Sequence, residues 1–389
     1  MSNKYAVPII LALSVAPNFV GMASAQDTIK LGMVMPLTGP LATAGQQVVA
    51  GARLYVSQHG DTVAGKRIEL IVRDDASSAD NGKRLIQEAI VNDKVDIIGG
   101  GLTADLLGSA TLITEAKKPT VIMLSSTTSV IEKSPYFVRT SCTLAQSAAI
   151  LADWAVQNGL KKAVTLVTDF APGQEAETTF SNNFTAAGGQ IAEAIRVPLR
   201  SPDFAPFLQR VREAMPQVLF VFVPSVQAAA FARQFVERGL DKAGVKLVGP
   251  GDMTDDSALV DMGDAMLGVV TAHFYSAAHP SALNGTFVAE YQKQNKSRAN
   301  FMAVSGYDGM HLIYEALKKT RGSVDGEAFV AAMKGMAWES PRGPMSIDRA
   351  TGEVVHNIYI RKVESVGGEL QNVEFATFNN IRDPRVAGK

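Results

Sequence analysis

The chain of 389 residues is long enough for two globular domains, and its 47% hydrophobic and 19% charged residues are typical of a packed globular protein. The formal net charge of −1 at pH 7 provides no general attraction to nucleic acid or to an anionic membrane, which argues against both as partners. The single cysteine, Cys142, cannot form an internal disulfide, and we expect its side chain to be buried.

The first 25 residues have the features of a secretory signal peptide. Lys4 supplies a positive charge, an apolar run covers 5–20, and the small-residue triplet at 23–25 has the A-x-A form of a cleavage site. Prolines interrupt the apolar run, and a membrane span would need about 20 uninterrupted apolar residues. We therefore expect the segment to be cleaved after Ala25 and the mature chain to be exported.

The rest of the chain alternates short apolar segments of β type with segments of helical periodicity. We predict strands at Ile29–Met35, Arg67–Arg73, Val95–Gly100, Thr120–Leu124, Ala163–Thr168, Val218–Val223 and Lys246–Gly249, and helices at Gln46–His59, Asn81–Asn92, Ala145–Asn158 and Ala229–Gly239. Several strands are apolar at consecutive positions, as expected for parallel strands with helices on both faces. Because the alternation restarts at Ala163, two sheets fit better than one. Polar, β-rich segments follow at Val354–Val363 and Phe375–Phe378.

Turns rich in hydroxyl groups and glycine follow many of these strands. They lie at Pro36–Pro40, Gly99–Asp105, Ser125–Ser129, Thr168–Gly173, Pro224–Ser225 and Gly249–Asp252. In open parallel sheets, ligands bind beyond the carboxyl ends of the strands, and N–H and O–H donors at helix starts can hold an anion. Any one turn could be an ordinary helix cap. Several turns on one edge instead predict a small-molecule site in a cleft between two lobes.

Catalytic signatures are missing from the sequence. The run Gly99–Gly101 lacks the Gly-Lys-Ser/Thr ending of a phosphate loop, and neither G-x-S-x-G nor H-E-x-x-H occurs. The five histidines lack metal-ligand spacing. Asp74 and Asp75 are neighbours on a strand and point to opposite faces, so we expect them to cap the next helix and not to share a proton. The chain is predicted to be a binding protein, not an enzyme, without metal or cofactor.

A series of short motifs points to a family. The motifs are Met35–Pro40, Gly45, Gly51-Ala52, Arg73–Asp75, Ile97–Gly99, Ser125–Thr128, Arg233–Leu240, Gly306–Gly309 and Arg342–Met345. In their order and spacing they resemble the leucine/isoleucine/valine-binding type of periplasmic solute receptor, a substrate-binding protein of ABC importers. The resemblance covers essentially the whole mature chain.

This resemblance implies an α/β fold of periplasmic binding protein type I. Two Rossmann-like lobes with parallel sheets would be joined by three crossover hinge strands, with 26–142 and 275–342 in lobe 1 and 143–274 and 343–389 in lobe 2. A periplasmic monomer would deliver a small molecule to a membrane permease and its ATPase subunits. A ligand sensor of the same fold and an exported enzyme are the alternatives.

The resemblance also implies ligand-binding residues. The carboxylate-binding positions of the family correspond to Thr103, Ser125 and Thr127, and Ser126 lies beside them. Phe170 is expected to form an aromatic wall, and Tyr307 of the Gly306–Gly309 motif is included in the set.

The positions that bind an ammonium group in amino-acid receptors differ here. Gly251 stands at the acidic position with Asp252 one residue later, while Ala44 and Pro224 stand where tyrosines are expected. A buried ammonium without an acidic partner is unfavourable by several kcal/mol. The differences favour a carboxylate ligand without an α-amino group, such as an aromatic acid, over a branched-chain amino acid, unless Asp252 reaches the ammonium.

Overall fold

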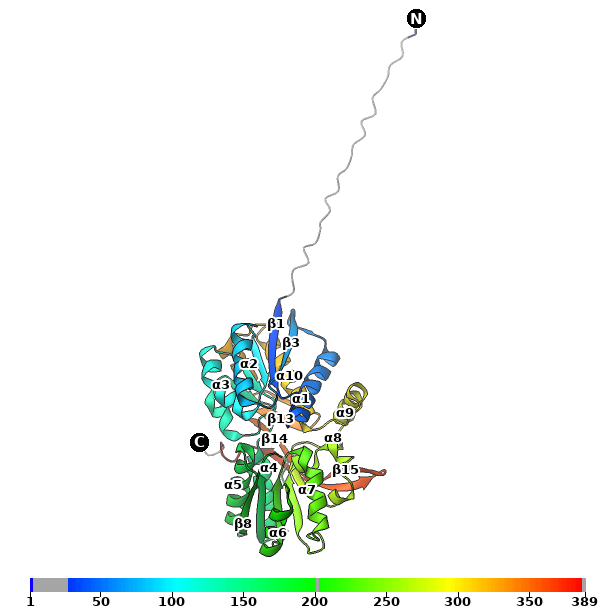
Figure 1. Cartoon of the computed structure of the whole chain (residues 1–389). Coiled ribbons are helices and arrows are strands. Elements are labelled where there is room, and N and C mark those ends of the chain that lie inside the picture. Colours follow the sequence, from blue (N-terminus) through cyan, green and yellow to red (C-terminus); the bar gives the residue numbers. More distant parts are fainter. Residues whose placement is uncertain (3–26, 201–202, 387–389) are drawn as a thin grey trace.

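The computed structural model describes residues 1–2, 27–200 and 203–386 and shows two α/β lobes stacked one above the other (Figure 1). This arrangement confirms the predicted fold class. Apart from Met1 and Ser2, the predicted signal peptide lies outside the described residues. Within the described parts of the chain, no helix combines the length and apolar character that a membrane span requires.

The first lobe is built on a six-stranded sheet in the order β2-β3-β1-β4-β5-β6. Its strands are β1 (Thr28–Met35), β2 (Thr62–Val63), β3 (Lys66–Asp74), β4 (Ile97–Gly100), β5 (Thr120–Ile122) and β6 (Phe137–Arg139). All pairs are parallel except β2 with β3. The central strand β1 is almost entirely buried, with Leu31 beside Leu70 of β3 and Ile97 of β4. The helical elements of this lobe are α1 (Ala42–His59), α2 (Ala79–Val91), α3 (Thr103–Glu115), η1 (Thr128–Lys133), α9 (Ala282–Asn295), α10 (Phe301–Lys319) and α11 (Gly326–Met333).

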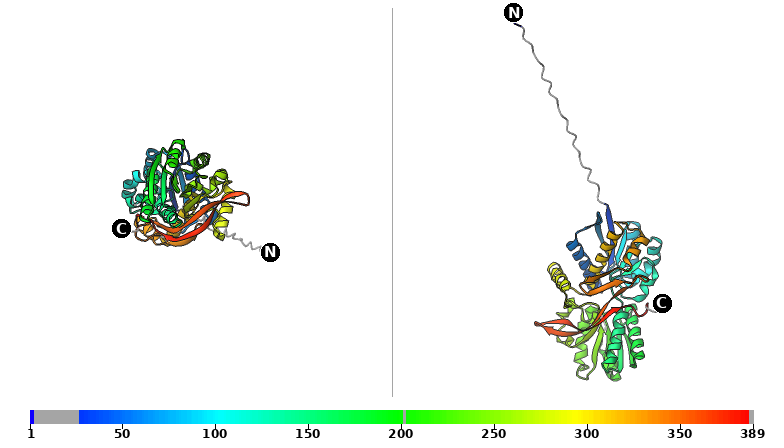
Figure 2. Two further views of the ribbon diagram at one scale, coloured as in Figure 1. Left: turned by 90° about the horizontal axis from the view of Figure 1, so that it is seen from below. Right: turned by 180° about the vertical axis from the view of Figure 1, so that it is seen from behind.

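The second lobe contains a nine-stranded mixed sheet in the order β12-β13-β14-β11-β10-β9-β7-β8, with β15 paired to β14. Its strands are β7 (Lys162–Thr168), β8 (Gln190–Val197), β9 (Val218–Phe222), β10 (Lys246–Pro250), β11 (Val270–His273), β12 (Ala337–Ser340), β13 (Gly343–Ile347), β14 (Val354–Val366) and β15 (Glu369–Ile381). Neighbouring strands among β7, β8, β9, β10 and β11 are parallel. The pairs formed by β12, β13, β14 and β15, including β11 with β14, are antiparallel. The β14–β15 hairpin runs along one side of the molecule (Figure 2). The helical elements are α4 (Leu144–Gln157), α5 (Ala171–Ala186), α6 (Ala205–Ala214), α7 (Ser225–Glu237), η2 (Gly251–Thr254), α8 (Asp256–Leu259) and η3 (Asp264–Met266).

Within the described chain, three ordered segments pass between the lobes. They join β6 to α4, β11 to α9, and α11 to β12. The predicted lobe limits at 142/143 and 274/275 fall in the first two segments. The predicted limit at 342/343 separates β12 from β13, although the structure pairs these strands in the second sheet.

Helices α1 and α10 pack closely in the first lobe because glycines stand at their contact. A Cβ atom at Gly51 would lie 1.8 Å from the Ala303 carbonyl oxygen, and one at Gly306 would lie 2.1 Å from the Val48 carbonyl oxygen. Neither space admits a side chain. This contact fixes the starts of both helices, which face the second lobe (Figure 1).

A buried ion pair joins the second sheet to the first lobe. Arg342, just before β13, places Nη2 2.8 Å from Asp308 Oδ2 of α10, and both side chains are almost fully buried. The same guanidinium donates to the Thr140 carbonyl oxygen at 2.6 Å and lies 4.6 Å from the centre of the Phe274 ring. Ser340 Oγ donates to the same Asp308 oxygen at 2.9 Å. Each charge therefore has several partners, as a charge in a low-dielectric interior requires.

We predict that Arg342→Ala destabilises the protein by about 3–5 kcal/mol, because it leaves the Asp308 carboxylate buried without its partner. Urea unfolding followed by circular dichroism measures this change. The double variant Asp308→Asn/Arg342→Met should recover part of the loss. Arg210→Ala, which removes an exposed partner of Glu193, is the control and should change stability by no more than about 1 kcal/mol. An Arg342→Ala effect as small as this control would contradict the prediction.

Candidate functional site

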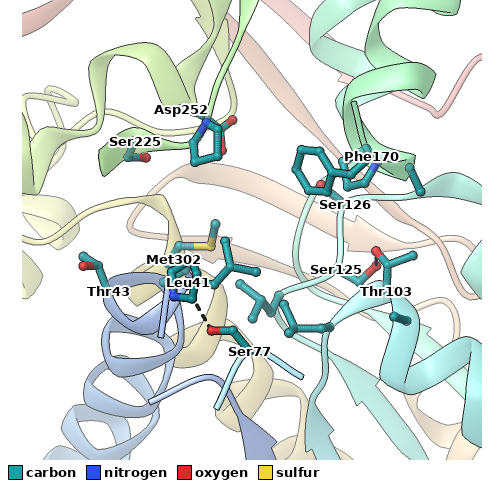
Figure 3. A pocket seen from close by; sticks show the side chains of 18 of the residues that line it. Leu41, Thr43, Ser77, Thr103, Ser125, Ser126, Phe170, Ser225, Asp252 and Met302 are labelled. Atoms are coloured by element: carbon teal, nitrogen blue, oxygen red, sulfur yellow. Dashed lines mark hydrogen bonds between the residues drawn. The ribbon is translucent and has the colours of Figure 1, made fainter. Parts of the chain in front are cut away.

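A cavity of about 390 Å³ lies between the two lobes (Figure 3). The first lobe contributes the starts of α1, α2 and α3 and the turn after β5. The second lobe contributes the starts of α5 and α7 and the turn after β10, and Met302 of α10 completes the wall. These positions lie at the carboxyl ends of parallel strands, where the sequence placed the ligand site. The volume is within the range of small-molecule sites, roughly 300–1,000 Å³.

The helices that begin at the cavity have no side-chain caps at their N-termini. No side-chain cap is present at the starts of α1, α2, α3, α5 and α7. By contrast, α4, α9, α10 and α11 are capped by Thr143, Ser281, Asn300 and Asp325. The first turn of a helix has N–H groups without intrahelical partners and carries a partial positive charge. In α1 these groups are largely used, since Ala42 N and Ala44 N donate to the Gly39 and Leu41 carbonyl oxygens. The N–H donors available to an anion therefore lie mainly at the starts of α2, α3, α5 and α7.

A cluster of hydroxyl groups lies beside the start of α3. Thr103 Oγ1 is 2.7 Å from Ser125 Oγ and donates to Thr127 Oγ1 at 3.2 Å. Because each hydroxyl group has one proton, Thr103 donates to Thr127 and Ser125 donates to Thr103 when the cluster bonds only with itself. Rotation of the Thr103 or Ser125 hydroxyl group turns its proton toward an acceptor in the cavity instead. This acceptor can be a carboxylate oxygen, because Thr103 and Ser125 line the cavity.

A buried arginine holds this hydroxyl-bearing turn in place. Arg139 Nη2 donates to the Thr127 carbonyl oxygen at 2.8 Å, and Nη1 donates to the Ser125 carbonyl oxygen. Its Nε lies 2.7 Å from Glu353 Oε1, and both side chains are nearly inaccessible to solvent. Burial raises the pKa of Glu353 to about 7, while Arg139 opposes the rise. The arginine acts on the backbone behind the turn and does not line the cavity.

The remaining walls of the cavity are mainly apolar. Phe170 lies at the start of α5 and stacks on Phe222 at a ring-centre distance of 5.9 Å. Leu41, Leu124 and Met302 add aliphatic surface. Among the described residues that line the cavity, none is Lys, Arg or His. An aromatic or aliphatic body fits these walls, with its charge held by N–H and O–H donors.

Two acidic residues reach the cavity from the second lobe. Asp252 follows β10, and burial raises the pKa of its carboxyl group to about 7. Asp255 caps α8 through Ser257 N at 2.8 Å and accepts from Asn300 Nδ2 of the first lobe at 2.9 Å. Asp255 therefore has a structural role between the lobes, whereas Asp252 lines the cavity (Figure 3).

Asp105, in the first turn of α3, was not predicted as a site residue. It lines the cavity edge and is completely buried, and its carboxyl group interacts with the carboxyl group of Asp75. Burial, together with the neighbouring Asp75, raises its pKa to about 8. The expectation that Asp74 and Asp75 cap the next helix was wrong. Asp74 accepts from Leu37 N at 2.8 Å, and Ser78 precedes α2 without a side-chain cap.

The position of Gly251 also differs from its interpretation in the sequence. A Cβ atom there would lie 1.8 Å from His273 Cδ2 and 2.6 Å from Arg361 Nη2. The missing side chain would therefore point into the second lobe and not into the cavity. The sequence located the correct turn, because Asp252 in this turn is the acidic residue at the cavity wall. Gly251 does not correspond to the ligand-binding acid, because a side chain at this position would not reach the cavity.

The structure brings together five of the seven predicted ligand residues. Thr103, Ser125, Ser126, Phe170 and Asp252 all line the cavity, as do Ala44 and Pro224. The other two do not. Thr127 lies behind Thr103, and Tyr307 of α10 donates to Gln58 Oε1 at 2.8 Å and packs on Tyr55. Tyr307 belongs to the α1–α10 contact, because its position on α10 directs it toward α1. Among the described residues, no group of three potential metal ligands is present.

Comparison with known proteins gives consistent matches over nearly the whole chain. Residues 28–368 match the family described as periplasmic binding protein. The chain is 37% identical to the Leu/Ile/Val-binding protein homolog 6 of Brucella abortus, covering 98% of both chains. A solute-binding protein of an ABC transporter from Rhodopseudomonas palustris BisB5, in complex with 3,4-dihydroxybenzoic acid, is 58% identical with a TM-score of 0.90, covering 92% of this chain and 99% of that one. Another from strain HaA2, in complex with p-hydroxybenzoic acid, is 38% identical with a TM-score of 0.90, covering 93% and 100%.

We predict that Asp105 makes stability depend on pH. Its pKa is about 8 in the folded chain and 3.8 in its ordinary state, so the folded state binds the proton more tightly. The tighter proton binding of folded Asp105 stabilises the protein fully below pH 3.8, and this stabilisation is lost as the pH rises toward 8. The stability of Asp105→Asn relative to the wild type should therefore increase from pH 5 to pH 8 by more than about 1 kcal/mol, and the two proteins should be most alike near pH 4.

Urea unfolding at the two pH values measures this difference. Asp261→Asn, at an exposed position of the second lobe, is the matched control and should leave the pH dependence unchanged. If Asp105→Asn shows the same change between pH 5 and pH 8 as the wild type, Asp105 is not protonated in the folded chain.

Proposed function

Because this chain belongs to the periplasmic binding protein family, we propose that it binds a small aromatic carboxylate between its lobes and delivers it to an ABC importer. The observation that carries the proposal is a cavity with apolar and aromatic walls that offers uncapped helix starts and hydroxyl groups, and no basic side chain, to its contents. Such donors hold a carboxylate without a cation. The exposed face of Phe170 fits an aromatic ring.

The ligands of similar proteins support an aromatic acid. The protein from strain BisB5 that is 58% identical was solved with 3,4-dihydroxybenzoic acid, and the protein from strain HaA2 with p-hydroxybenzoic acid. Both ligands combine a carboxylate with a flat ring, which matches the division of this cavity into a hydroxyl-rich end and apolar walls.

The proposal includes where the protein acts and with which partners. We place it in the periplasm after cleavage behind Ala25, as a monomer that presents its ligand to a membrane permease with ATPase subunits. The chain itself performs no reaction and needs no cofactor. Hinge motion at the three segments between the lobes would open and close the cavity.

A receptor for branched-chain amino acids is the second candidate. Asp252 favours it, because an acidic group at the cavity wall could pair with a ligand ammonium. The name of the Brucella abortus relative is also consistent with this function.

The two candidates differ in the ligand that stabilises the native state. We expect 3,4-dihydroxybenzoate to raise the melting temperature of the purified protein and to bind in calorimetry, and leucine to do neither. A ligand at 100 times its Kd stabilises the native state by about 2.7 kcal/mol. Micromolar or tighter binding of leucine, with no binding of the aromatic acid, would contradict the proposal.

Variants of the hydroxyl cluster provide a second arm of this test. Thr103→Val should weaken binding of the aromatic acid by about 1.5–3 kcal/mol, the usual range for a hydrogen bond to a charged group. Thr127→Val should weaken it less, because Thr127 does not line the cavity. Unchanged affinity in Thr103→Val would place the carboxylate elsewhere.

A further inference from the structure

We infer that Asp252 is the specificity-determining residue that selects aromatic acids with a ring hydroxyl remote from the carboxylate, by accepting a hydrogen bond from that hydroxyl. The inference rests on the proposed function, because it assumes that an aromatic carboxylate occupies the cavity. It goes further by assigning a second polar contact and a preference among benzoic acids.

The first argument is that Asp252 retains acceptor capacity. The neighbouring acids are occupied: Asp255 accepts from Ser257 and Asn300, and Asp256 accepts from Asn372 Nδ2 at 2.9 Å. Within the described chain, the hydrogen bond that reaches the Asp252 carboxyl group comes from its own backbone N–H. A group enclosed by protein but open to the cavity is best satisfied by a donor on the ligand.

The second argument is the place of Asp252 relative to the hydroxyl cluster. Figure 3 shows Thr103, Ser125 and Ser126 at one side of the cavity and Asp252 with Ser225 at the other, with Phe170 between them in this view. A ligand that uses both sides must separate its acceptor from its donor by an apolar body. An α-amino acid carries both groups on one carbon, whereas a hydroxybenzoate carries them on opposite sides of a ring.

The third argument is that no residue in the described part of the chain forms a direct ion pair with Asp252. The charged and titratable groups that act on it are Asp255 of the same turn and Arg361 of β14, and Cys142 before α4 is also within its influence. Arg361 is engaged elsewhere, since it donates to Thr271 Oγ1 at 3.1 Å and to the Tyr275 carbonyl oxygen. A neutral hydroxyl donor satisfies Asp252 without bringing a second full charge into the cavity.

The test compares benzoate, 4-hydroxybenzoate and 2-hydroxybenzoate by calorimetry at pH 8 with the wild type, Asp252→Leu and Asp252→Asn. We expect the wild type to bind 4-hydroxybenzoate about tenfold or more tightly than benzoate, the effect of a hydrogen bond to a charged group. The 2-hydroxy isomer should show no such gain, because its hydroxyl lies beside the carboxylate.

The variants test whether Asp252 causes this preference. Asp252→Leu should remove the preference for 4-hydroxybenzoate while retaining benzoate binding. Asp252→Asn, which keeps a neutral acceptor, should reduce the preference only in part. Asp261→Leu is the matched control at an exposed acid of the same lobe and should retain the preference.

The pH dependence of binding is an independent readout. Burial raises the pKa of Asp252 to about 7, with Asp255 adding to the rise and Arg361 opposing it. A hydroxyl donor binds the carboxylate better than the protonated acid, so the ligand lowers this pKa and its affinity increases with pH. Asp105 at the cavity edge ionises over part of the same range and affects both carboxylate ligands. From pH 6 to pH 8 we therefore expect the affinity for 4-hydroxybenzoate, relative to that for benzoate, to rise up to about tenfold. The same ratio in Asp252→Leu should show no such rise.

Several outcomes would overturn the inference. Two results would refute the inference and leave the proposed function intact. One is equal affinity of the wild type for benzoate and 4-hydroxybenzoate, and the other is a preference for 4-hydroxybenzoate that survives in Asp252→Leu. Tight leucine binding that is lost in Asp252→Asn would make Asp252 an ammonium partner. Failure of every benzoate to bind the wild type would refute the proposed function together with the inference. Melting curves of each variant without ligand separate loss of binding from loss of folding.

Discussion

An anion can be enclosed between two protein lobes without a basic side chain only if enough N–H and O–H donors remain free to replace its water. This constraint explains the most distinctive feature of the cavity, the uncapped starts of five helices on two lobes. Four other helices, α4, α9, α10 and α11, use side chains to satisfy the same groups, whereas the N-cap residue of α6, which also begins away from the cavity, makes no such hydrogen bond. Because no side chain competes for these donors, a ligand carboxylate can accept their hydrogen bonds.

Such a site works only if its donors are held in position. Two buried arginines act on the backbone around it: Arg139 fixes the carbonyl groups of the Ser125–Thr127 turn, and Arg342 joins β13 to α10. A buried ion pair adds little net stability compared with well-packed apolar residues. Its contribution here is positional, because each guanidinium donates to a main-chain carbonyl oxygen as well as to its acid.

The sequence was sufficient to predict the fold class and most of the cavity wall. Strands such as 218–223 are apolar at consecutive positions because helices cover both faces of the sheet, and this pattern is readable without a structure. Strand β8 was missed because its residues are mostly exposed and alternate in burial. The lining residues Thr103, Ser125 and Asp252 follow predicted strands, so the rule for open sheets located them.

Side-chain direction could not be predicted in the same way. Tyr307 lies in a motif of the family, yet the rotation of α10 turns it toward α1. Gly251 precedes the acid at the cavity, yet its Cβ direction leads to His273. Asp105 pairs with Asp75 across 30 positions of sequence because α3 packs against α2, where a Cβ atom at Gly82 would lie 2.1 Å from Asp105 Cγ. Each case depends on distant segments meeting in space.

The central claim is that the two lobes hold the two ends of one aromatic acid. A crystal structure of the protein with bound 4-hydroxybenzoate tests it most directly. The account predicts the carboxylate within about 3 Å of the Thr103 and Ser125 hydroxyls, the ring against Phe170, and the hydroxyl within about 3 Å of Asp252. A ligand bound in the reverse orientation, or one that contacts only one lobe, would contradict it.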